Sequence, residues 1–256
     1  MNWENELFNE NEKPLDRLVD GYSNTSIFRT IAFVGDSLSS GEFESRDEEG
    51  NPGYHDLFEY SWGQYIARKN GLTAYNFSRG GMSTKEYVES FAGKMGFWGT
   101  DKACQAYVIA LGVNDIYNMN MEIGSIDDIG TDKPTFVRYY AEIVKRYKKI
   151  SPDAKFFFVT FPNTNTPHRD DKTLGMIDAL YSMAEYFDNS YVIDLYHYGP
   201  VHDERFKEKF YLYYHMNPSG YVLTARIIDS YIDYIIRHNP DDFRTAALIG
   251  TGIEDK

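Results

Sequence analysis

The stretch TIAFVGDSLSSGE, residues 30–42, decides the fold of this chain. Its first residues are typical of a buried strand. That strand ends abruptly at Gly35, which an aspartate and several serines follow. Asp36 and Ser37 at such a point indicate a turn or a helix cap, because their side chains bond nearby backbone groups. They equally indicate a nucleophile at the edge of a sheet. The rest of the chain has to distinguish these two interpretations.

Four further apolar runs of strand length follow this stretch, and amphipathic segments separate them. The predicted strands are Ile31–Val34, Ala74–Phe77, Ala106–Leu111, Phe156–Phe161 and Tyr191–Leu195. Strands that alternate with long helices pair in parallel through right-handed crossovers. The sequence therefore predicts an α/β protein, a three-layer α/β/α sandwich with about five parallel strands.

The segments between the strands carry helix signals. Gly71 predicts the C-cap of a helix over 62–71, and Pro134 is expected at the first position of a helix that ends near residue 150. A third helix is predicted over Leu174–Phe187, and the pair Asn217–Pro218 predicts the start of the last long helix. The acidic segment Phe43–Asp56 is interpreted as a surface loop.

One domain accounts for most of the chain. We expect residues 1–28 to be an N-terminal extension, residues 29–239 the α/β domain and residues 240–256 a C-terminal tail. The net charge of −13 repels phosphate backbones and anionic lipid headgroups, so neither nucleic acid nor a membrane is an expected partner. The single cysteine, Cys104, is expected to be a small buried residue.

The N-terminus is acidic and lacks the apolar region of a secretory signal, and no stretch approaches the roughly 18 apolar residues of a membrane span. The expectation is a soluble cytoplasmic protein. The 22 tyrosines indicate either aromatic-lined pockets or a tyrosine-rich surface. The composition leaves the oligomeric state open.

Sites in parallel sheets form at the carboxyl ends of the strands, so the chemistry is sought there. Ser37 follows the first strand and is the candidate nucleophile, and His215 lies just before the last helix as its candidate base. The backbone N–H groups of Ser37 and Gly81 and the side-chain amide of Asn114 are candidate donors to an oxyanion. Together these residues predict acyl transfer.

The same residues carry a resemblance to the SGNH (GDSL) hydrolase superfamily, esterases and lipases of flavodoxin-like α/β/α fold. Its motifs match Gly35-Asp36-Ser37-Leu38, Asn76-x-Ser78-x-x-Gly81, Gly112-x-Asn114-Asp115 and the block from His215 to Tyr221. The resemblance implies Ser37 as nucleophile, Gly81 and Asn114 in the oxyanion hole, and His215 as base. It also implies that Asp36 and Asp115 brace the loops.

The sequence departs from that family at one position. The family places an aspartate three residues before the histidine, where this chain has Leu212. The site is then a Ser–His dyad, an impaired site, or a triad completed from elsewhere; the candidates by position are Asp203, Glu204 and Asp194. A true Asp-x-x-His occurs at Asp194–His197, but no helix start follows His197, so His215 is preferred. The cluster of His197, His202 and Asp203 is interpreted as a solvated loop.

No nucleotide-binding loop, α/β-hydrolase elbow or metal-binding histidine motif is present, and serine chemistry needs no cofactor and no metal. The sequence predicts a serine esterase acting on a small acylated substrate. O-acetylated carbohydrate is the first expectation, because Tyr117, Tyr213 and Tyr214, or Trp62 and Trp98, are placed to stack on a sugar. The alternatives are a catalytically weak protein that binds an acylated ligand or a protein partner, and an acyltransferase.

Overall fold

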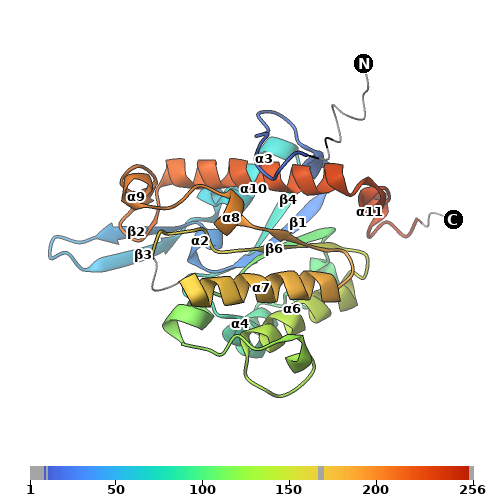
Figure 1. Cartoon of the computed structure of the whole chain (residues 1–256), viewed down its shortest axis with the longest axis horizontal. Coiled ribbons are helices and arrows are strands. Elements are labelled where there is room, and N and C mark those ends of the chain that lie inside the picture. Colours follow the sequence, from blue (N-terminus) through green and yellow to red (C-terminus); the bar gives the residue numbers. More distant parts are fainter. Residues whose placement is uncertain (1–8, 10, 167–169, 254–256) are drawn as a thin grey trace.

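A sheet of five parallel strands forms the centre of the computed structural model, which describes residues 9, 11–166 and 170–253 (Figure 1). The strand order is β4-β1-β5-β6-β7. The bounds are β1 (Thr30–Gly35), β4 (Thr73–Ser78), β5 (Ala106–Ala110), β6 (Lys155–Val159) and β7 (Ser190–Ile193). All five strand predictions are confirmed. Strand β1 lies between β4 and β5, and Gly35 is level with Ser78 and Ala110 at their ends.

Helices cover both faces of the sheet, which confirms the three-layer α/β/α prediction (Figure 1). Helices α3 (Trp62–Asn70) and α10 (Pro218–His238) lie on one face, and α6 (Phe136–Ile150) and α7 (Asp170–Tyr186) lie on the other. The shorter helices are α2 (Ser37–Ser40), α4 (Thr84–Glu86), α5 (Ala92–Lys94), α8 (Leu195–Tyr198), α9 (Glu204–Phe210) and α11 (Pro240–Phe243). Single 3₁₀ or π turns are η1 (Asn24–Ile27), η2 (Phe58–Tyr60), η3 (Tyr87–Phe91), η4 (Thr100–Lys102), η5 (Asn114–Asn118), η6 (Ile126–Asp128) and η8 (Ala246–Leu248).

The helix ends follow the capping signals, with one exception. Gly71 ends α3 at φ +68°, a left-handed conformation that glycine adopts without strain, and Asn217 caps α10 by accepting from the N–H of Gly220. The prediction that Pro134 opens α6 is wrong. Thr135 is the N-cap, because its side chain accepts from the N–H of Arg138, so the helix begins at Phe136.

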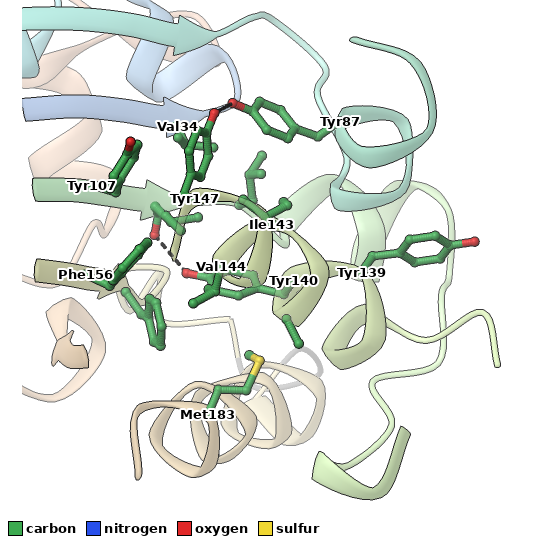
Figure 2. Close-up of a cluster of buried hydrophobic side chains, with 14 of the residues drawn as sticks. Val34, Tyr87, Tyr107, Tyr139, Tyr140, Ile143, Val144, Tyr147, Phe156 and Met183 are labelled. Atoms are coloured by element: carbon green, nitrogen blue, oxygen red, sulfur yellow. Dashed lines mark hydrogen bonds between the residues drawn. The ribbon is translucent and has the colours of Figure 1, made fainter. Parts of the chain in front are cut away.

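Tyrosines fill the core beneath α6 and α7, a location that neither interpretation of the tyrosine content had proposed (Figure 2). Tyr87, Tyr107, Tyr140 and Tyr147 are all fully buried. The hydroxyls of Tyr87 and Tyr147 lie 2.5 Å apart, and Tyr140 donates to the carbonyl of Ile109 at 3.1 Å. The Tyr107 hydroxyl accepts from a backbone N–H at 3.0 Å. Each of the four hydroxyls therefore has a partner, so these rings contribute apolar area without an unpaired polar group.

The described ends of the chain pack on the domain. Phe243 of α11 is 6% exposed and contacts the rings of Phe28, Phe157 and Tyr191 in the core beneath α3 and α10. Near the other end, Glu12 accepts two hydrogen bonds from the guanidinium of Arg237, at 2.6 and 2.8 Å. Both terminal segments therefore add contacts to the α10 face.

The acidic segment after α2 forms a β-hairpin, so its interpretation as a surface loop is wrong. Strands β2 (Glu42–Arg46) and β3 (Pro52–Asp56) pair antiparallel and extend from one end of the molecule (Figure 1). The hairpin forms because β2 alternates: Phe43 packs against Tyr60 and Tyr221, while Glu42 and Glu44 are buried on the opposite side. A second small ribbon, β8 (Tyr211–Leu212) with β9 (His215–Met216), lies against it.

Two other expectations can be compared with the structure. Cys104 is buried and free, and burial raises the pKa of its thiol to about 12, as expected for a small core residue. Among the described helices, none combines the length and the apolar character that a membrane crossing requires.

We predict that Phe243→Ala lowers the free energy of unfolding by about 3 kcal/mol, because a buried ring is lost and a cavity remains. The melting temperature should fall by roughly 10 °C. Tyr22→Ala is the control, since Tyr22 is 82% exposed and its loss should change little. Equal melting temperatures for Phe243→Ala and wild type would show that α11 is not part of the cooperative fold.

Candidate active site

The candidate site lies where strands β1, β4 and β5 end. Ser37 is the first residue of α2 directly after β1, Gly81 follows β4, and Asn114 follows β5. The strand order reverses direction at β1, and open α/β sheets place their ligands at such a switch point. Parallel pairing therefore brings together three residues that are far apart in the sequence.

A tight strand-to-helix turn presents Ser37. Asp36 is the N-cap of α2, and its Oδ1 accepts from the N–H of Leu38 at 3.1 Å. Glycine is required at residue 35, because a Cβ there would lie 2.2 Å from the Ser39 hydroxyl oxygen. The turn thus caps α2 and also positions the Ser37 side chain at the end of β1. A helix cap and a candidate nucleophile, the two interpretations of residues 30–42, are therefore compatible.

Ser37 and His215 both line one cleft with a volume of about 800 Å³. Tyr213 and Tyr214, suggested as sugar platforms, line it too. Tyr117 packs instead against Phe161 and bonds its hydroxyl to Thr173. Trp62 and Trp98, also suggested as sugar platforms, pack against Phe33 in one core and Tyr147 in the other.

The two outer oxyanion candidates occupy neighbouring loops. Gly81 has φ +70°, in a turn where the N–H of Met82 donates to Arg79. The Nδ2 of Asn114 donates to the carbonyl of Met82 at 3.0 Å and lies 3.4 Å from Asp36. The amide of Asn114 therefore ties the β5 end to both other loops.

Asp115 connects the end of β5 to the residues that follow the β4 loop. Its carboxylate accepts from the backbone N–H of Thr84 at 2.9 Å and from the Thr84 hydroxyl at 2.6 Å. Burial raises the pKa of Asp115, and the hydrogen bonds from Thr84 oppose that rise. This residue links the end of β5 to α4, so it acts on the site through the backbone.

His215 lies between two glutamates of the β2–β3 hairpin. Its Nδ1 is 3.3 Å from Oε2 of Glu44, and its Nε2 is 2.9 Å from Oε1 of Glu42. Burial alone would lower the pKa of His215, but the two carboxylates outweigh it and raise the pKa above the ordinary 6.5. Neither glutamate was a candidate in the sequence analysis: Glu44 belongs to the segment interpreted as a loop, and Glu42 directly precedes it.

Within the described residues, no hydrogen bond joins the Ser37 hydroxyl to His215, whose Nε2 faces Glu42 instead. Leu212, at the position where the resembling family has its aspartate, is 42% exposed and pairs with His215 through the backbone of the β8–β9 ribbon. The acid that contacts the ring therefore comes from another part of the chain.

The acids proposed by sequence position have other partners in the described structure. Asp194 caps α8 and lies 2.7 Å from Nδ1 of His197. Asp203 caps α9, and Glu204 pairs with Lys207 on the surface. Among the described residues, the carboxylates paired with the His215 ring are instead those of Glu42 and Glu44, although Glu204 lines the same cleft.

The interpretation of the His197, His202 and Asp203 cluster as a solvated loop is wrong for His202. This side chain is buried, stacks on Phe206 at 4.0 Å and has its Nδ1 2.9 Å from the Tyr211 hydroxyl. Burial lowers the pKa of His202 to about 4, so the ring is neutral at physiological pH. His202 therefore contributes packing under the β8–β9 ribbon.

The cap residue Asp36 titrates unusually. Burial raises its pKa from 3.8 to about 7, the N–H of Leu38 opposes the rise, and the charge of Asp115 adds to it. Because the folded-state pKa exceeds the unfolded-state value, folding takes up a proton between these two pH values. The contribution of Asp36 to stability is therefore largest at low pH and is lost as the pH rises through about 7.

The sequence profile of the GDSL-like lipase/acylhydrolase family matches residues 33–223. No match to the chain was found among curated protein sequences. Solved structures with the same fold include a family two carbohydrate esterase from Clostridium thermocellum, in complex with cellohexaose. That structure has a TM-score of 0.58 and 15% identity, over 88% of this chain and 67% of that chain.

Two further structures are similar. A family 2 carbohydrate esterase with a carbohydrate-binding domain, from Corynascus thermopiles (Myceliophthora fergusii), has a TM-score of 0.55 and 15% identity, over 91% of this chain and 69% of that chain. A lipolytic protein of the G-D-S-L family from Desulfitobacterium hafniense DCB-2 has a TM-score of 0.52 and 15% identity, over 79% of this chain and 99% of that chain. At such identities the similarity shows a shared fold.

We predict that Asp36→Asn is tolerated better at pH 8 than at pH 5. Asparagine caps a helix as well as aspartate and carries no charge to bury. The difference in unfolding free energy between variant and wild type should shift in favour of the variant by about 2 kcal/mol over this range. Denaturant unfolding at both pH values measures it, and other titrating groups cancel because both proteins contain them. A constant difference would contradict the raised pKa.

Proposed function

The chain belongs to the GDSL-like lipase/acylhydrolase family, and we propose that it is a serine esterase with Ser37 as nucleophile and His215 as base. One observation carries the proposal: Ser37 and His215, separated by most of the domain in sequence, line the same cleft at the switch point of the sheet. A serine and a histidine that share a cleft meet the first requirement of nucleophilic catalysis.

In the proposed reaction the Ser37 hydroxyl oxygen attacks the carbonyl carbon of the ester while Nε2 of His215 takes the hydroxyl proton. The carbonyl oxygen becomes an oxyanion, for which the N–H groups of Ser37 and Gly81 and the amide of Asn114 are the donors. The tetrahedral intermediate expels the alcohol, which takes the proton from Nε2. Water then attacks the acyl-enzyme by the same route and releases the acid and free Ser37.

The oxyanion would replace the weaker of the two contacts that the Asn114 amide makes, the one to Asp36 at 3.4 Å. The stronger contact, to the carbonyl of Met82 at 3.0 Å, can remain, because an amide nitrogen has two hydrogens to donate. This arrangement supports the assignment of Asn114 as a donor already held in place by the loop after β4.

The proposed substrate is a small acyl ester of a carbohydrate. Tyr54, Tyr213 and Tyr214 surround His215 with exposed rings, which are 56%, 52% and 79% exposed. Arg46 lies 4.7 Å from the Tyr213 ring centroid and steadies that ring. Exposed aromatic faces beside a cleft suit the apolar faces of sugar rings. The similar structures of carbohydrate esterases support the same substrate class.

A second candidate is a protein that binds an acylated ligand without turning it over. The position of Glu42 favours this candidate, because it lies at the nitrogen that has to receive the serine proton. Acyl transfer to an acceptor other than water uses the same residues and differs in the second step alone. Detection of a covalent adduct on the serine separates a working nucleophile from a pure binding site.

We predict that a fluorophosphonate adds once to the wild-type protein and that the adduct maps to Ser37. Ser37→Ala should show no adduct and should hydrolyse p-nitrophenyl acetate and acetylated oligosaccharides at less than about 1% of the wild-type rate. Ser45→Ala is the matched control, because Ser45 is a serine whose hydroxyl lies 2.9 Å from Nε2 of His55 on the exposed hairpin.

Intact mass spectrometry and peptide mapping read out the adduct, and initial rates read out hydrolysis. Ser45→Ala should behave as the wild type in both. An adduct that maps elsewhere, or hydrolysis that persists in folded Ser37→Ala, contradicts the assignment. A folded wild-type protein that gains no adduct favours the binding candidate.

A further inference from the structure

We propose that Glu44 of strand β2 is the positioning acid of His215, in place of an acid at residue 212. The inference rests on the proposed function, since it concerns the base of that reaction. In serine hydrolases a buried acid behind the histidine fixes which nitrogen holds the proton and stabilises the imidazolium that forms. Glu44 has the contacts that this role requires.

The carboxylate of Glu44 is fully buried and fully paired. Its Oε2 accepts from the N–H of Tyr214 at 3.0 Å and lies 3.3 Å from Nδ1 of His215, while its Oε1 pairs with Arg46. The side chain is 0% exposed. A carboxylate buried this completely stays charged only where partners compensate its lost hydration, and these three supply the compensation.

The backbone on both sides holds this contact in place. Glu44 pairs with Tyr54 in the β2–β3 hairpin, and His215 pairs with Leu212 in the β8–β9 ribbon. Tyr213, at the turn of that ribbon, has φ +61°, and its ring lies under the Arg46 guanidinium. Arg46 therefore contacts both Glu44 and the turn of the ribbon. A rigid element on each side meets the precision that a positioning contact needs.

Glu42 faces the other ring nitrogen and has the opposite consequence. Its Oε1 lies 2.9 Å from Nε2, the atom that must accept the serine proton. Its Oε2 occupies space that only a glycine leaves, since a Cβ at Gly80 would lie 1.9 Å from it. Glu42 therefore competes with Ser37 for Nε2 and places negative charge beside the loop that holds Gly81.

Other charged and titratable groups also face His215 or line its cleft. The charge of Asp36 acts on the ring, and Tyr54 presents an edge to it at 5.8 Å between centroids. The remaining charged and titratable groups that line the cleft are Glu204, Lys207, Glu208, Tyr211, Tyr213 and Tyr214. Among the described residues, the carboxylates that contact the ring nitrogens are those of Glu42 and Glu44, so these two are the groups to vary.

The test compares Glu44→Gln, Glu44→Asp and Glu42→Gln in the intact protein, with p-nitrophenyl acetate as probe. We expect Glu44→Gln to lower kcat by about 10²- to 10⁴-fold with little change in KM, because the ring loses its orientation and its counter-charge. Glu44→Asp keeps the charge and should exceed Glu44→Gln in kcat by about tenfold or more. Glu42→Gln should raise kcat/KM at neutral pH, since it removes the negative charge that favours a proton on Nε2.

The pH profile adds a readout that a merely structural role would not move. The reaction needs neutral His215, so kcat/KM of the wild type should rise with pH through an apparent pKa above 6.5. Removing either carboxylate should shift this rise to lower pH. Glu44→Gln and Glu42→Gln should therefore move the pKa alike and the rate in opposite directions. Glu49→Gln, on the exposed hairpin turn, is the control and should match the wild type.

The inference is overturned if folded Glu44→Gln keeps more than about half of the wild-type kcat, or if both glutamine variants lose rate equally. If Glu44→Gln does not fold, Glu44→Asp and Glu42→Gln decide: a fall in rate for Glu42→Gln, or no shift in its profile, overturns it. Ser37→Ala, assayed in parallel, separates the two proposals. Hydrolysis lost in Ser37→Ala but unaffected by Glu44 rejects the role of Glu44 alone, whereas hydrolysis retained in Ser37→Ala rejects the proposed function.

Discussion

The pairing of β1 with a parallel strand on each side is the constraint on which the site depends. Because β4 and β5 both run parallel to β1, their carboxyl ends meet at one edge of the sheet, with Gly35 level with Ser78 and Ala110. The loops that follow then have little freedom. Asn114 and Asp115 tie the β5 end to the loop after β4, so the presentation of Ser37 is determined by strand pairing and not by local turn preference alone.

The proposed base, His215, is positioned in a different way. His215 belongs to the β8–β9 ribbon, which lies against the β2–β3 hairpin, and its ring is held by carboxylates from that hairpin. The chain therefore positions the proposed nucleophile with the central sheet and the proposed base with two small ribbons.

The sheet could be predicted from the sequence because apolar strands such as Ala106–Ala110 are buried on both faces and contain no competing signal. The position of Ser37, Gly81 and Asn114 at this edge of the sheet could be predicted because each lies in a loop or turn that follows such a strand. The role of the hairpin could not be predicted, because its buried face consists of Glu42 and Glu44, and charged residues in a strand look like a solvated loop. The family motif also pointed to residue 212, where this chain has a leucine.

The most direct test of the proposed site is the protonation state of His215, measured by nitrogen NMR of the imidazole during a pH titration. With Glu44 beside Nδ1, the imidazolium should lose one of its two ring protons at a pH above 6.5, and the other should stay on Nδ1, so that Nε2 has a lone pair to accept from Ser37. A neutral ring with its proton on Nε2 would contradict this arrangement, because such a histidine cannot serve Ser37 as a base.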